Sequence, residues 1–309
     1  MEVLRGAHER PSEQRPTVCT VGMFDGVHRG HGMLFDRVLN EAKALDARSG
    51  VVTFDPHPLA ELAPAKAPCM LTTLDQRLRL FEGAGFDVAL VLPFDEELAA
   101  LSPERFARAA LVEELNVCKI LVGEDFRFGH DRAGDVSTLR EIGKKDGFDA
   151  DAVGLLEGDE GKISSSDVRL LLGSGQVEGA AVLLGRPYRL WGTVVEGDRR
   201  GRDLGFPTAN IAPHPQACLP GNGVYAGWWV SEAGRLPAAI NVGVRPTFRS
   251  DDKRLCEVHV LDFEGDLYGA TGEVEFAAYL RPELKFDSAE ALIEQMRSDV
   301  SDARRRLRS

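Results

Sequence analysis

Residues 20–31 read TVGMFDGVHRGH and lie between two segments of different character. An apolar run ends at Val21, and a segment with helical periodicity begins at Met33. This order predicts a strand, a glycine-lined turn and a helix. Glycines let a phosphate approach the main chain, and a helix N-terminus carries free N–H groups and partial positive charge. We therefore expect His28, His31 and the first helical turn to bind a nucleotide triphosphate together.

Two other interpretations of the histidine pair stay open. A metal pair usually brings a third Cys, His or carboxylate ligand at recognisable spacing, and none is evident nearby. The two imidazoles could instead cap and pack an ordinary turn. The glycines and the strand-to-helix context favour a phosphate site over both. The dinucleotide motif GxGxxG and the phosphate loop GxxxxGK[ST] are absent, so phosphate would be held in a different way.

The size and composition of the chain are typical of a globular protein with two domains. Its 309 residues are enough for two cores, and 43% of them are hydrophobic while 28% are charged. No apolar run approaches the roughly 20 residues that cross a bilayer, and residues 1–15 lack the apolar core of a signal peptide. We expect a cytoplasmic protein without a membrane partner.

The net charge and the cysteines exclude further classes of partner and site. The net charge of −12 opposes binding to a polyphosphate backbone, so we expect no nucleic-acid partner. The five cysteines are scattered, odd in number and without CxxC, which favours buried thiols in a reducing compartment over a disulfide framework or a zinc site. They are Cys19, Cys69, Cys118, Cys218 and Cys256.

The first half of the chain alternates apolar strand-like runs with longer helical patterns. This alternation predicts an α/β fold, with a mostly parallel sheet covered on both faces and ligands at the carboxyl ends of its strands. We expect strands at 18–21, 51–54, 88–92 and 120–122, and helices near 33–45, 74–83, 103–115 and 137–145.

From about Arg186 the pattern changes to short strands separated by glycine and proline turns. This pattern predicts a small antiparallel β-barrel closed by a C-terminal helix over 288–307. We expect its strands at 188–195, 223–230, 238–242, 257–261 and 273–280. We place the linker within 173–187 and the domains at 1–180 and 181–309.

Three further segments lie where strands of the first half end. FDPHP, at 54–58, carries His57 in a loop stiffened by two prolines. This loop could form a wall of the pocket, although the same residues are also typical of a rigid structural turn. The segment VGEDFRFG, at 122–129, carries Asp125 and is equally compatible with a packed loop. In ISSSDVR, at 163–169, the serines could simply be N-caps. Together with Arg169 they would instead form a second phosphate clamp.

The second half has one exceptional stretch, GDRRGRDLGFPTAN at 197–210. Pro207 stiffens the segment that presents Thr208 and Asn210 on one side of an extended chain. A hydroxyl and an amide oxygen are hard ligands of the kind that Mg²⁺ accepts beside ATP phosphates. A plain glycine-rich hairpin is the alternative.

A strand at 255–261, LCEVHVL, alternates between two faces. Cys256, Val258 and Val260 share the face that we expect in the core, and Glu257 and His259 share the other. A strand glutamate is usually solvated. If its face lines a pocket, Glu257 can act as the general base for a hydroxyl nucleophile.

Taken together, the motifs resemble those of the bacterial bifunctional riboflavin kinase/FMN adenylyltransferases, over nearly the whole chain. The resemblance rests on GMFDGVHRGH, FDPHP, VGEDFRFG and ISSSDVR, then GRDLGFPTAN, PGNGVYAG, INVGVRPTF, EVHVLDFEGDLYG and YLRPELKFDS. It implies a Rossmann-like nucleotidyltransferase domain that transfers AMP from ATP to FMN, giving FAD and pyrophosphate. It also implies a C-terminal barrel that phosphorylates riboflavin to FMN with ATP and Mg²⁺.

The resemblance also implies roles for individual residues. The nucleotide site of the first half would use His28 and His31, with Arg169 in the clamp, and Glu257 would be the base of the kinase half, where Thr208 and Asn210 hold Mg²⁺. Further binding residues would be Gly22, Phe24, Asp25, Gly26, His57, Asp125, Ser164 and Ser165 in the first half, and Gly201, Arg202, Gly205 and Pro207 in the second. Asp125 stands where some relatives have asparagine, and Ser166 where threonine is commoner.

Two rival functions stay open for the first half. It could be a flavin-binding or regulatory module without catalysis, although the intact His28, His31 and Arg169 argue against this. It could also transfer a nucleotidyl group to another phosphate acceptor, such as a pantetheine or nicotinamide mononucleotide. The attached GRDLGFPTAN segment favours the flavin enzyme over that second rival. The sequence leaves open whether the chain self-associates.

Overall fold

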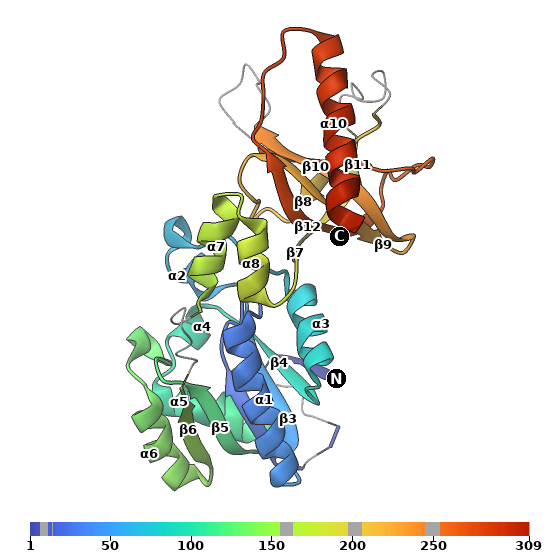
Figure 1. Cartoon of the computed structure of the whole chain (residues 1–309). Helices are drawn as coiled ribbons and strands as arrows, with labels where there is room; N and C mark the ends of the chain where they lie inside the picture. Colours follow the sequence, from blue (N-terminus) through green and yellow to red (C-terminus); the bar gives the residue numbers. More distant parts are fainter. Residues whose placement is uncertain (7–11, 14, 155–162, 197–205, 245–253, 309) are drawn as a thin grey trace. The chain divides into compact units, whose positions relative to one another are not determined.

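The computed structural model describes the chain except residues 7–11, 14, 155–162, 197–205, 245–253 and 309. It divides into two compact units (Figure 1). The first unit comprises Met1–Pro68 and Leu74–Ser164, and the second comprises Cys69–Thr73 and Ser165–Ser309.

The first unit is built on a six-stranded parallel sheet with the order β1-β4-β3-β2-β5-β6. All four expected strands are present, and β2 lies between β3 and β5. The strands are β1 (Glu2–Arg5), β2 (Thr17–Val21), β3 (Arg48–Asp55), β4 (Val88–Pro93), β5 (Val117–Gly123) and β6 (Asp149–Val153). The predicted parallel sheet is therefore confirmed, with β1 and β6 added at its two edges.

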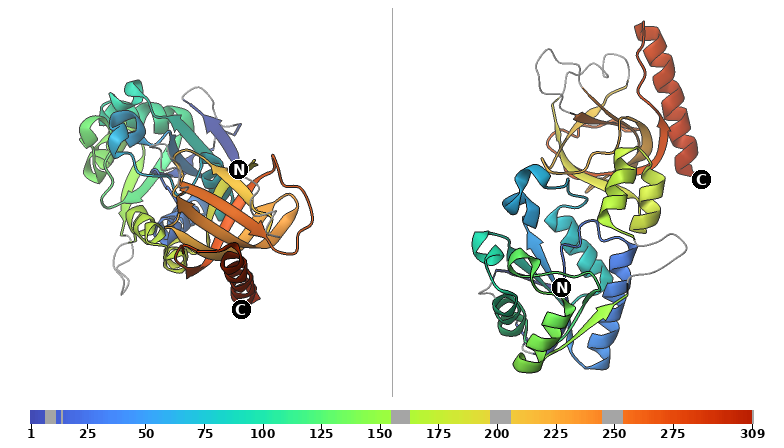
Figure 2. Two further views of the ribbon diagram at one scale, coloured as in Figure 1. Left: turned by 90° about the horizontal axis from the view of Figure 1, so that it is seen from above. Right: turned by 90° about the vertical axis from the view of Figure 1, so that its left-hand side faces the viewer.

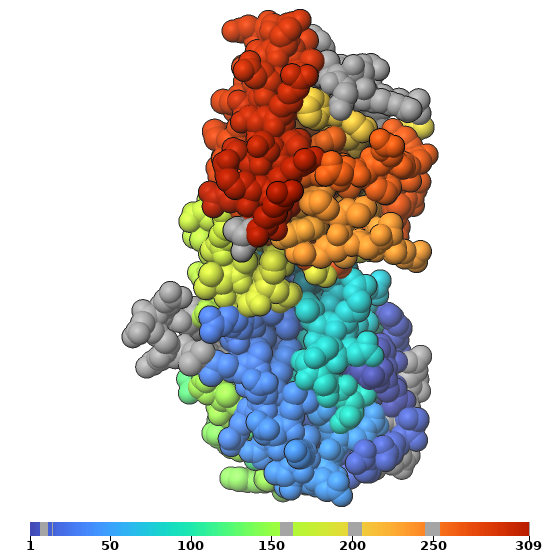
Figure 3. Space-filling view, turned by 45° about the vertical axis from the view of Figure 1, so that its right-hand side comes forward, coloured from blue at the N-terminus to red at the C-terminus, as the bar shows by residue number. Residues whose placement is uncertain are grey.

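Two cores form because helices cover both faces of this sheet (Figure 1). In Figure 3 the blue segment that contains α1 (Arg29–Ala44) and the cyan segment that contains α3 (Leu74–Ala84) lie side by side on the visible side of the first unit. Apolar residues of α1 and α3, among them Phe35 and Phe81 with ring centroids 5.7 Å apart, pack together on one face. Apolar residues of α5, η2 and α6 pack on the other. The helical segments are α1 (Arg29–Ala44), α2 (Pro58–Leu62), η1 (Pro64–Lys66), α3 (Leu74–Ala84), α4 (Glu96–Ala99), α5 (Pro103–Phe106), η2 (Ala107–Glu113, a π-helix), η3 (His130–Arg132) and α6 (Val136–Asp146).

The second unit contains a closed six-stranded antiparallel barrel with the order β10-β11-β8-β7-β12-β9. Its strands are β7 (Tyr188–Val195), β8 (Ala209–Pro213), β9 (Gly223–Ser231), β10 (Gly234–Val244), β11 (Arg254–Val260) and β12 (Thr271–Arg281). The C-terminal helix α10 (Ala289–Arg308) packs against the outside of β9, β10 and β12 (Figure 2). The predicted barrel with its terminal helix is confirmed, and β8 is the strand that the sequence analysis did not name.

Helices α7 (Ser165–Gly173) and α8 (Val177–Leu184) pack with the barrel of the second unit. Val168 and Leu172 of α7 belong to the same core as Tyr188 and Leu190 of β7. Packing therefore divides the chain near residue 165. The boundary at 180/181 that we expect between the functional domains stays a prediction.

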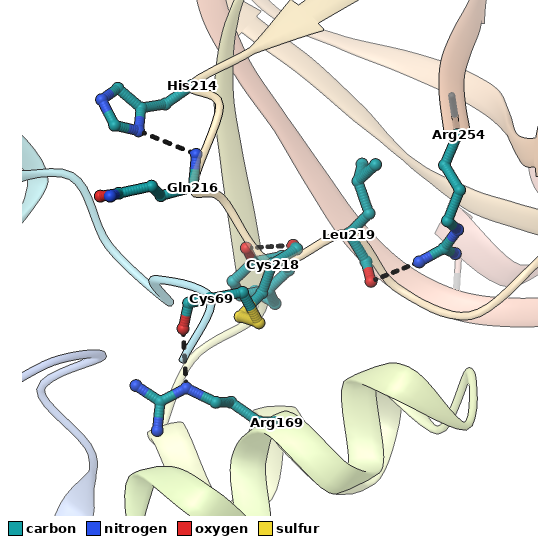
Figure 4. Close-up of a disulfide and its surroundings, with 8 residues drawn as sticks. Cys69, Arg169, His214, Gln216, Cys218, Leu219 and Arg254 are labelled. Carbon is teal, nitrogen blue, oxygen red and sulfur yellow. Dashed lines mark hydrogen bonds between the residues drawn. A yellow bond between two sulfur atoms is a disulfide. The ribbon is translucent and has the colours of Figure 1, made fainter. Parts of the chain in front are cut away.

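A disulfide joins Cys69 and Cys218 within the second unit (Figure 4). The expectation of five free thiols is wrong for this pair, and the free cysteines are Cys19, Cys118 and Cys256. The two bonded residues are 149 positions apart in sequence, yet their Cα atoms lie 4.9 Å apart. The backbone N–H of Met70 donates to the carbonyl oxygen of Gln216, and the carbonyl oxygen of Met70 accepts from the N–H of Cys218. These two bonds hold Cys69 beside Cys218, and cysteine spacing alone does not reveal this proximity.

Candidate active sites

The turn after β2 has an unusual backbone. Phe24 and Val27 have φ values of 49° and 42°, and Gly26 between them has 82°. A positive φ is strained for a bulky residue and more so for a β-branched one. Such strain persists where the surrounding structure holds it, and it is commonest at functional sites. The turn lies at the carboxyl end of β2, where a parallel sheet places its ligands.

The two imidazoles of the motif are stacked on one another. Their ring centroids lie 3.6 Å apart with 18° between the planes. His28 is the N-cap of α1, and its Nδ1 accepts a hydrogen bond from the backbone N–H of His31 at 3.3 Å. Because Nδ1 accepts, neutral His28 carries its proton on Nε2. This arrangement makes Nε2 a donor at the helix N-terminus.

His31 is held in its neutral form. Burial lowers its pKa well below the usual range, and the neighbouring His28 lowers that pKa further. Its Nδ1 is buried and has no hydrogen-bond partner among the described residues. The ring of Phe24 packs edge-on against His31 with centroids 5.1 Å apart. At neutral pH the His31 ring is therefore uncharged, so it can offer a ligand a hydrogen bond but not a positive charge.

Gly30 permits a close approach beside the imidazoles. A Cβ atom at Gly30 would lie 3.2 Å from the ring of His28 and 3.6 Å from the carbonyl oxygen of Ile163. The start of the ISSSDVR segment therefore lies near the histidine turn, within the first unit. Ser164 follows Ile163 directly.

The rest of the expected clamp lies in the second unit. Ser165 is the first residue of α7, and Nε of Arg169 donates to the carbonyl oxygen of Cys69 at 2.7 Å (Figure 4). The convergence of Ser165 and Arg169 with the histidines stays a prediction.

The two strands beside β2 carry other expected residues at their ends. His57, after β3, caps α2 because its Nδ1 accepts from the N–H of Leu59 at 3.1 Å. Asp125, after β5, lies in a turn closed by a hydrogen bond from Phe126 to Gly123 of 3.0 Å. The turn of Gly22 and Asp25, with Asp25 buried, lies between them in the sheet order.

In the second unit, three polar residues form a row across neighbouring strands. Glu257 of β11 pairs with Asn210 of β8 on one side and with Asn241 of β10 on the other. Nδ2 of Asn241 lies 3.4 Å from a carboxylate oxygen of Glu257. Cys256 and Val258 belong to the barrel core, so the predicted division of β11 into a core face and a face with Glu257 is confirmed.

A cavity of about 530 Å³ lies at one end of the barrel. Nδ1 of His259 donates to the carbonyl oxygen of Pro207 at 2.8 Å and anchors the segment that enters β8. The cavity is lined by Val194, Pro207, Thr208, Ala209, Val258, Val260 and residues 263–268. Thr208 is therefore at the cavity, while Asn210 and Glu257 are not among its lining residues. Gly201, Arg202 and Gly205 lie outside the described residues.

Asn241 and Arg77 are two residues at these sites that the sequence analysis missed. Asn241 belongs to INVGVRPTF, and an amide between apolar strand residues was the available signal. Arg77 is buried in α3 against the turn after β2 and the end of β3. Its helical spacing from Leu78 and Phe81 places it on the apolar face of α3, unlike the exposed Arg79, and this spacing was the available signal.

Two kinds of feature are absent from the described part of the chain. No three His, Cys, Asp or Glu side chains gather there as metal ligands. No helix there is both long and apolar enough to pass through a bilayer.

Comparison with known proteins gives two family matches that follow each other along the chain. Residues 10–167 match the FAD synthetase family, and residues 184–307 match the riboflavin kinase family. The two matches follow the two packing units with two exceptions. Cys69–Thr73 lies within the first match but packs in the second unit, and α7 and the residues before β7 fall at the junction.

Full-length relatives carry both domains. The bifunctional riboflavin kinase/FMN adenylyltransferase of Pseudomonas fluorescens is 40% identical over 98% of this chain and 97% of its own length. The enzyme of the same name from Escherichia coli K12 is 38% identical over 98% and 97%. A crystal structure from Streptococcus pneumoniae, titled as a macrolide-efflux protein, has a TM-score of 0.88 and 28% identity over 98% of this chain and 99% of that one.

The two activities correspond to the two halves of the chain. The N-terminal half is the FMN adenylyltransferase, which makes FAD from FMN and ATP, and the C-terminal half is the riboflavin kinase, which makes FMN from riboflavin and ATP. The chain belongs to the family of bifunctional riboflavin kinase/FMN adenylyltransferases.

Proposed function

We propose that adenylyl transfer takes place at the turn between β2 and α1, and that riboflavin phosphorylation takes place beside Glu257. The observation that carries the first assignment is the stacked pair His28 and His31 at the N-terminus of α1. The row Asn210, Glu257 and Asn241 supports the second.

In adenylyl transfer, a phosphate oxygen of FMN attacks the α-phosphorus of ATP. The bond from that phosphorus to the bridging oxygen breaks, and pyrophosphate leaves with the electron pair. Nε2–H of His28 and the free N–H groups of α1 are suited to hold the phosphate oxygens and the charge that develops on them. Loss of one such donor typically costs about 10² to 10³ in rate.

Other residues of the first half would bind the nucleotide and close the site. Ser164, Ser165 and Arg169 would supply a second clamp on the phosphates. Gly22, Phe24, Asp25, Gly26, His57 and Asp125 would line the nucleotide site. No covalent enzyme intermediate is needed, because positioning and charge stabilisation account for this chemistry.

In phosphorylation, Glu257 would take the proton of the ribityl 5′-hydroxyl. The oxygen then attacks the γ-phosphorus of ATP, and ADP leaves with the electron pair of the broken bond. General-base catalysis of this kind is worth about 10² to 10⁴ in rate. Gly201, Arg202, Gly205 and Pro207 would hold the ATP.

Thr208 and Asn210 fit a magnesium site because each has a neutral side-chain oxygen that can bind the ion. Asn210 is the register partner of Glu257, and Thr208 lines the cavity. When bound there with ATP, Mg²⁺ neutralises charge on the transferring phosphates. The residues themselves would orient the triphosphate toward Glu257.

The experiment that tests the two assignments uses one variant in each half. Purified wild type, His28→Asn and Glu257→Gln are incubated with riboflavin, ATP and Mg²⁺, and FMN and FAD are followed by chromatography. We expect His28→Asn to accumulate FMN without FAD. We expect Glu257→Gln to make no FMN from riboflavin, yet to make FAD when FMN is supplied.

The rival functions predict different results in the same assay. A first half that only binds flavin would form no FAD in the wild type. A transferase for another acceptor would give pyrophosphate with pantetheine phosphate or nicotinamide mononucleotide faster than with FMN. Loss of both activities in one folded variant would contradict two separate sites.

We also propose a cytoplasmic location, because both reactions consume ATP. Sedimentation of the purified chain measures whether it self-associates.

A further inference from the structure

We propose that Arg77 is a positioning residue for adenylyl transfer, because its buried guanidinium contacts both the turn that follows β2 and the last two residues of β3. This inference rests on the proposed function, which places the nucleotide at the turn between β2 and α1. Arg77 itself lies on α3.

The contacts of Arg77 reach the main chain of the turn after β2 and the carboxyl end of β3. Nη1 donates to the carbonyl oxygen of Met23 at 2.9 Å, and it lies 3.3 Å from the carbonyl oxygen of Phe54. Nη2 lies 3.5 Å from the carboxylate of Asp55. Met23 directly precedes Phe24 in the strained turn, and Asp55 directly precedes the loop that carries His57. One side chain therefore fixes the distance between two segments that flank the expected nucleotide site.

Thr53 of β3 completes this arrangement. Its hydroxyl donates to the carbonyl oxygen of Met23 at 3.1 Å, and it lies 3.3 Å from Nη1 of Arg77. The carbonyl oxygen of Met23 thus receives two donors from two different elements. This backbone atom is held in place directly before the residues with positive φ.

The positive charge of Arg77 is buried close to two carboxylates, those of Asp25 and Asp55. Its side chain is only 1% exposed, and burial lowers the pKa of the guanidinium, while the nearby Asp25 and Asp55 act to raise it. Asp25 is only 3% exposed. A guanidinium stays protonated even when its pKa falls, so Arg77 brings a full positive charge beneath the motif that holds Asp25.

A purely structural role does not explain this side chain. Burying a charge is costly, and an apolar side chain of similar size often packs in its place without loss of stability. The Nε and Nη2 atoms of Arg77 are buried and have no hydrogen-bond partner among the described residues. Hydrogen bonds therefore offset the cost of burying this charge only in part. We take the cost as a sign that Arg77 serves to hold the turn after β2 and the end of β3 in place, and not only to stabilise the fold.

The experiment compares Arg77→Lys with Arg79→Lys in the full-length protein. Arg79 lies two residues further along the same helix and is exposed, so it is the matched control. Lysine keeps the charge at position 77 but replaces the planar fork with a single ammonium, which cannot hold Met23 and Asp55 in the same geometry. A displacement of about 1 Å in a catalytic site costs about 10² in rate.

We expect Arg77→Lys to lower kcat of FAD formation about 100-fold, with less than a threefold change in the Kd of ATP at the N-terminal site. Riboflavin phosphorylation by the same chain and the melting transition report whether the protein is folded, and both should match those of Arg79→Lys. An FAD-forming rate within twofold of the wild type would overturn the proposal. So would a Kd for ATP that rises in proportion to the loss of kcat.

A second variant covers the case in which lysine destabilises the first unit. Arg77→Gln retains hydrogen-bond donors without charge, and it should also lose FAD formation while it keeps phosphorylation. If both variants unfold the first unit, Arg77 is a stability residue and the proposal is wrong. His28→Asn in parallel separates the two hypotheses, because retained FAD formation in that variant contradicts the proposed site itself.

Discussion

Asn241 directs its side-chain amide at the carboxylate of Glu257, from the strand beside it in the barrel. The two residues are register partners on β10 and β11, with 3.4 Å between Nδ2 and Oε2. A general base needs a fixed orientation toward the proton that it removes. Glu257, the expected base of the kinase, is therefore flanked by Asn241 on one neighbouring strand and by Asn210 on the other.

We predict that Asn241→Ala lowers kcat of FMN formation about tenfold, which corresponds to about 1.4 kcal/mol in the activation free energy. The effect is moderate because the hydrogen bond is long. Asn241→Asp should cost more, since it places a second negative charge opposite Glu257. Steady-state kinetics of riboflavin phosphorylation measures both, and FAD formation from supplied FMN is the control that should not change. An unchanged kcat in both variants would remove Asn241 from this role.

His31 predicts a pH dependence of stability in the first unit. Its folded pKa lies well below the unfolded value of about 6.5. Below pH 6.5 the unfolded chain binds a proton that the folded chain does not, so stability falls as the pH decreases. The slope for one proton is at most about 1.4 kcal/mol per pH unit.

Urea unfolding of the first unit between pH 7 and pH 5 measures this slope. We expect His31→Asn to lower this slope by up to about 1.4 kcal/mol per pH unit. Equal slopes in the wild type and in His31→Asn would contradict a neutral buried imidazole.

The disulfide predicts the number of reactive thiols. Denatured protein kept without reductant should show three thiols per chain, and five after reduction. In the native state Cys19 and Cys256 should react slowly, because burial raises the pKa of both thiols and blocks access to them. Thiol titration and mass spectrometry after alkylation measure this, with Cys218→Ser as the matched variant.

Cys218→Ser should also destabilise the second unit, by about 2 to 4 kcal/mol, if the bond contributes as disulfides commonly do. Five reactive thiols in the unreduced, denatured chain would mean that the original expectation of free cysteines is right in solution.

The fold was largely predictable because its inner elements carry strong apolar patterns. β2, β3, β4 and β5 are apolar runs, and all four were expected. β6 alternates aspartate with small residues and lies at the sheet edge, where a strand is buried less and its pattern is weak. The helix expected at 103–115 is instead α5 followed by the π-helix η2, a change in hydrogen bonding that helical periodicity does not reveal.

The sites were predictable only in part, because motifs name residues and not their partners. The spacing of His28 and His31 predicted a shared site, but the stacking and the tautomer follow from the capping geometry. Arg77 and Asn241 contact residues distant in sequence, so their positions on an apolar face or strand mark them as unusual but do not name their partners. The pairing of Cys69 with Cys218 depends in the same way on how the 69–73 segment packs.

Thr208 predicts a metal dependence that can be assigned to one half of the chain. Thr208→Val keeps the shape of the side chain at the barrel cavity but removes the oxygen that would bind Mg²⁺. We expect the Mg²⁺ concentration for half-maximal FMN formation to rise at least tenfold, with FAD formation from supplied FMN unchanged. Removal of metal with a chelator should stop FMN formation in the wild type, and added Mg²⁺ should restore it. Thr193→Val, a partly buried threonine on β7, is the matched control. If Thr208→Val lowers FMN formation equally at every Mg²⁺ concentration, the hydroxyl contacts riboflavin or ATP and does not bind the metal.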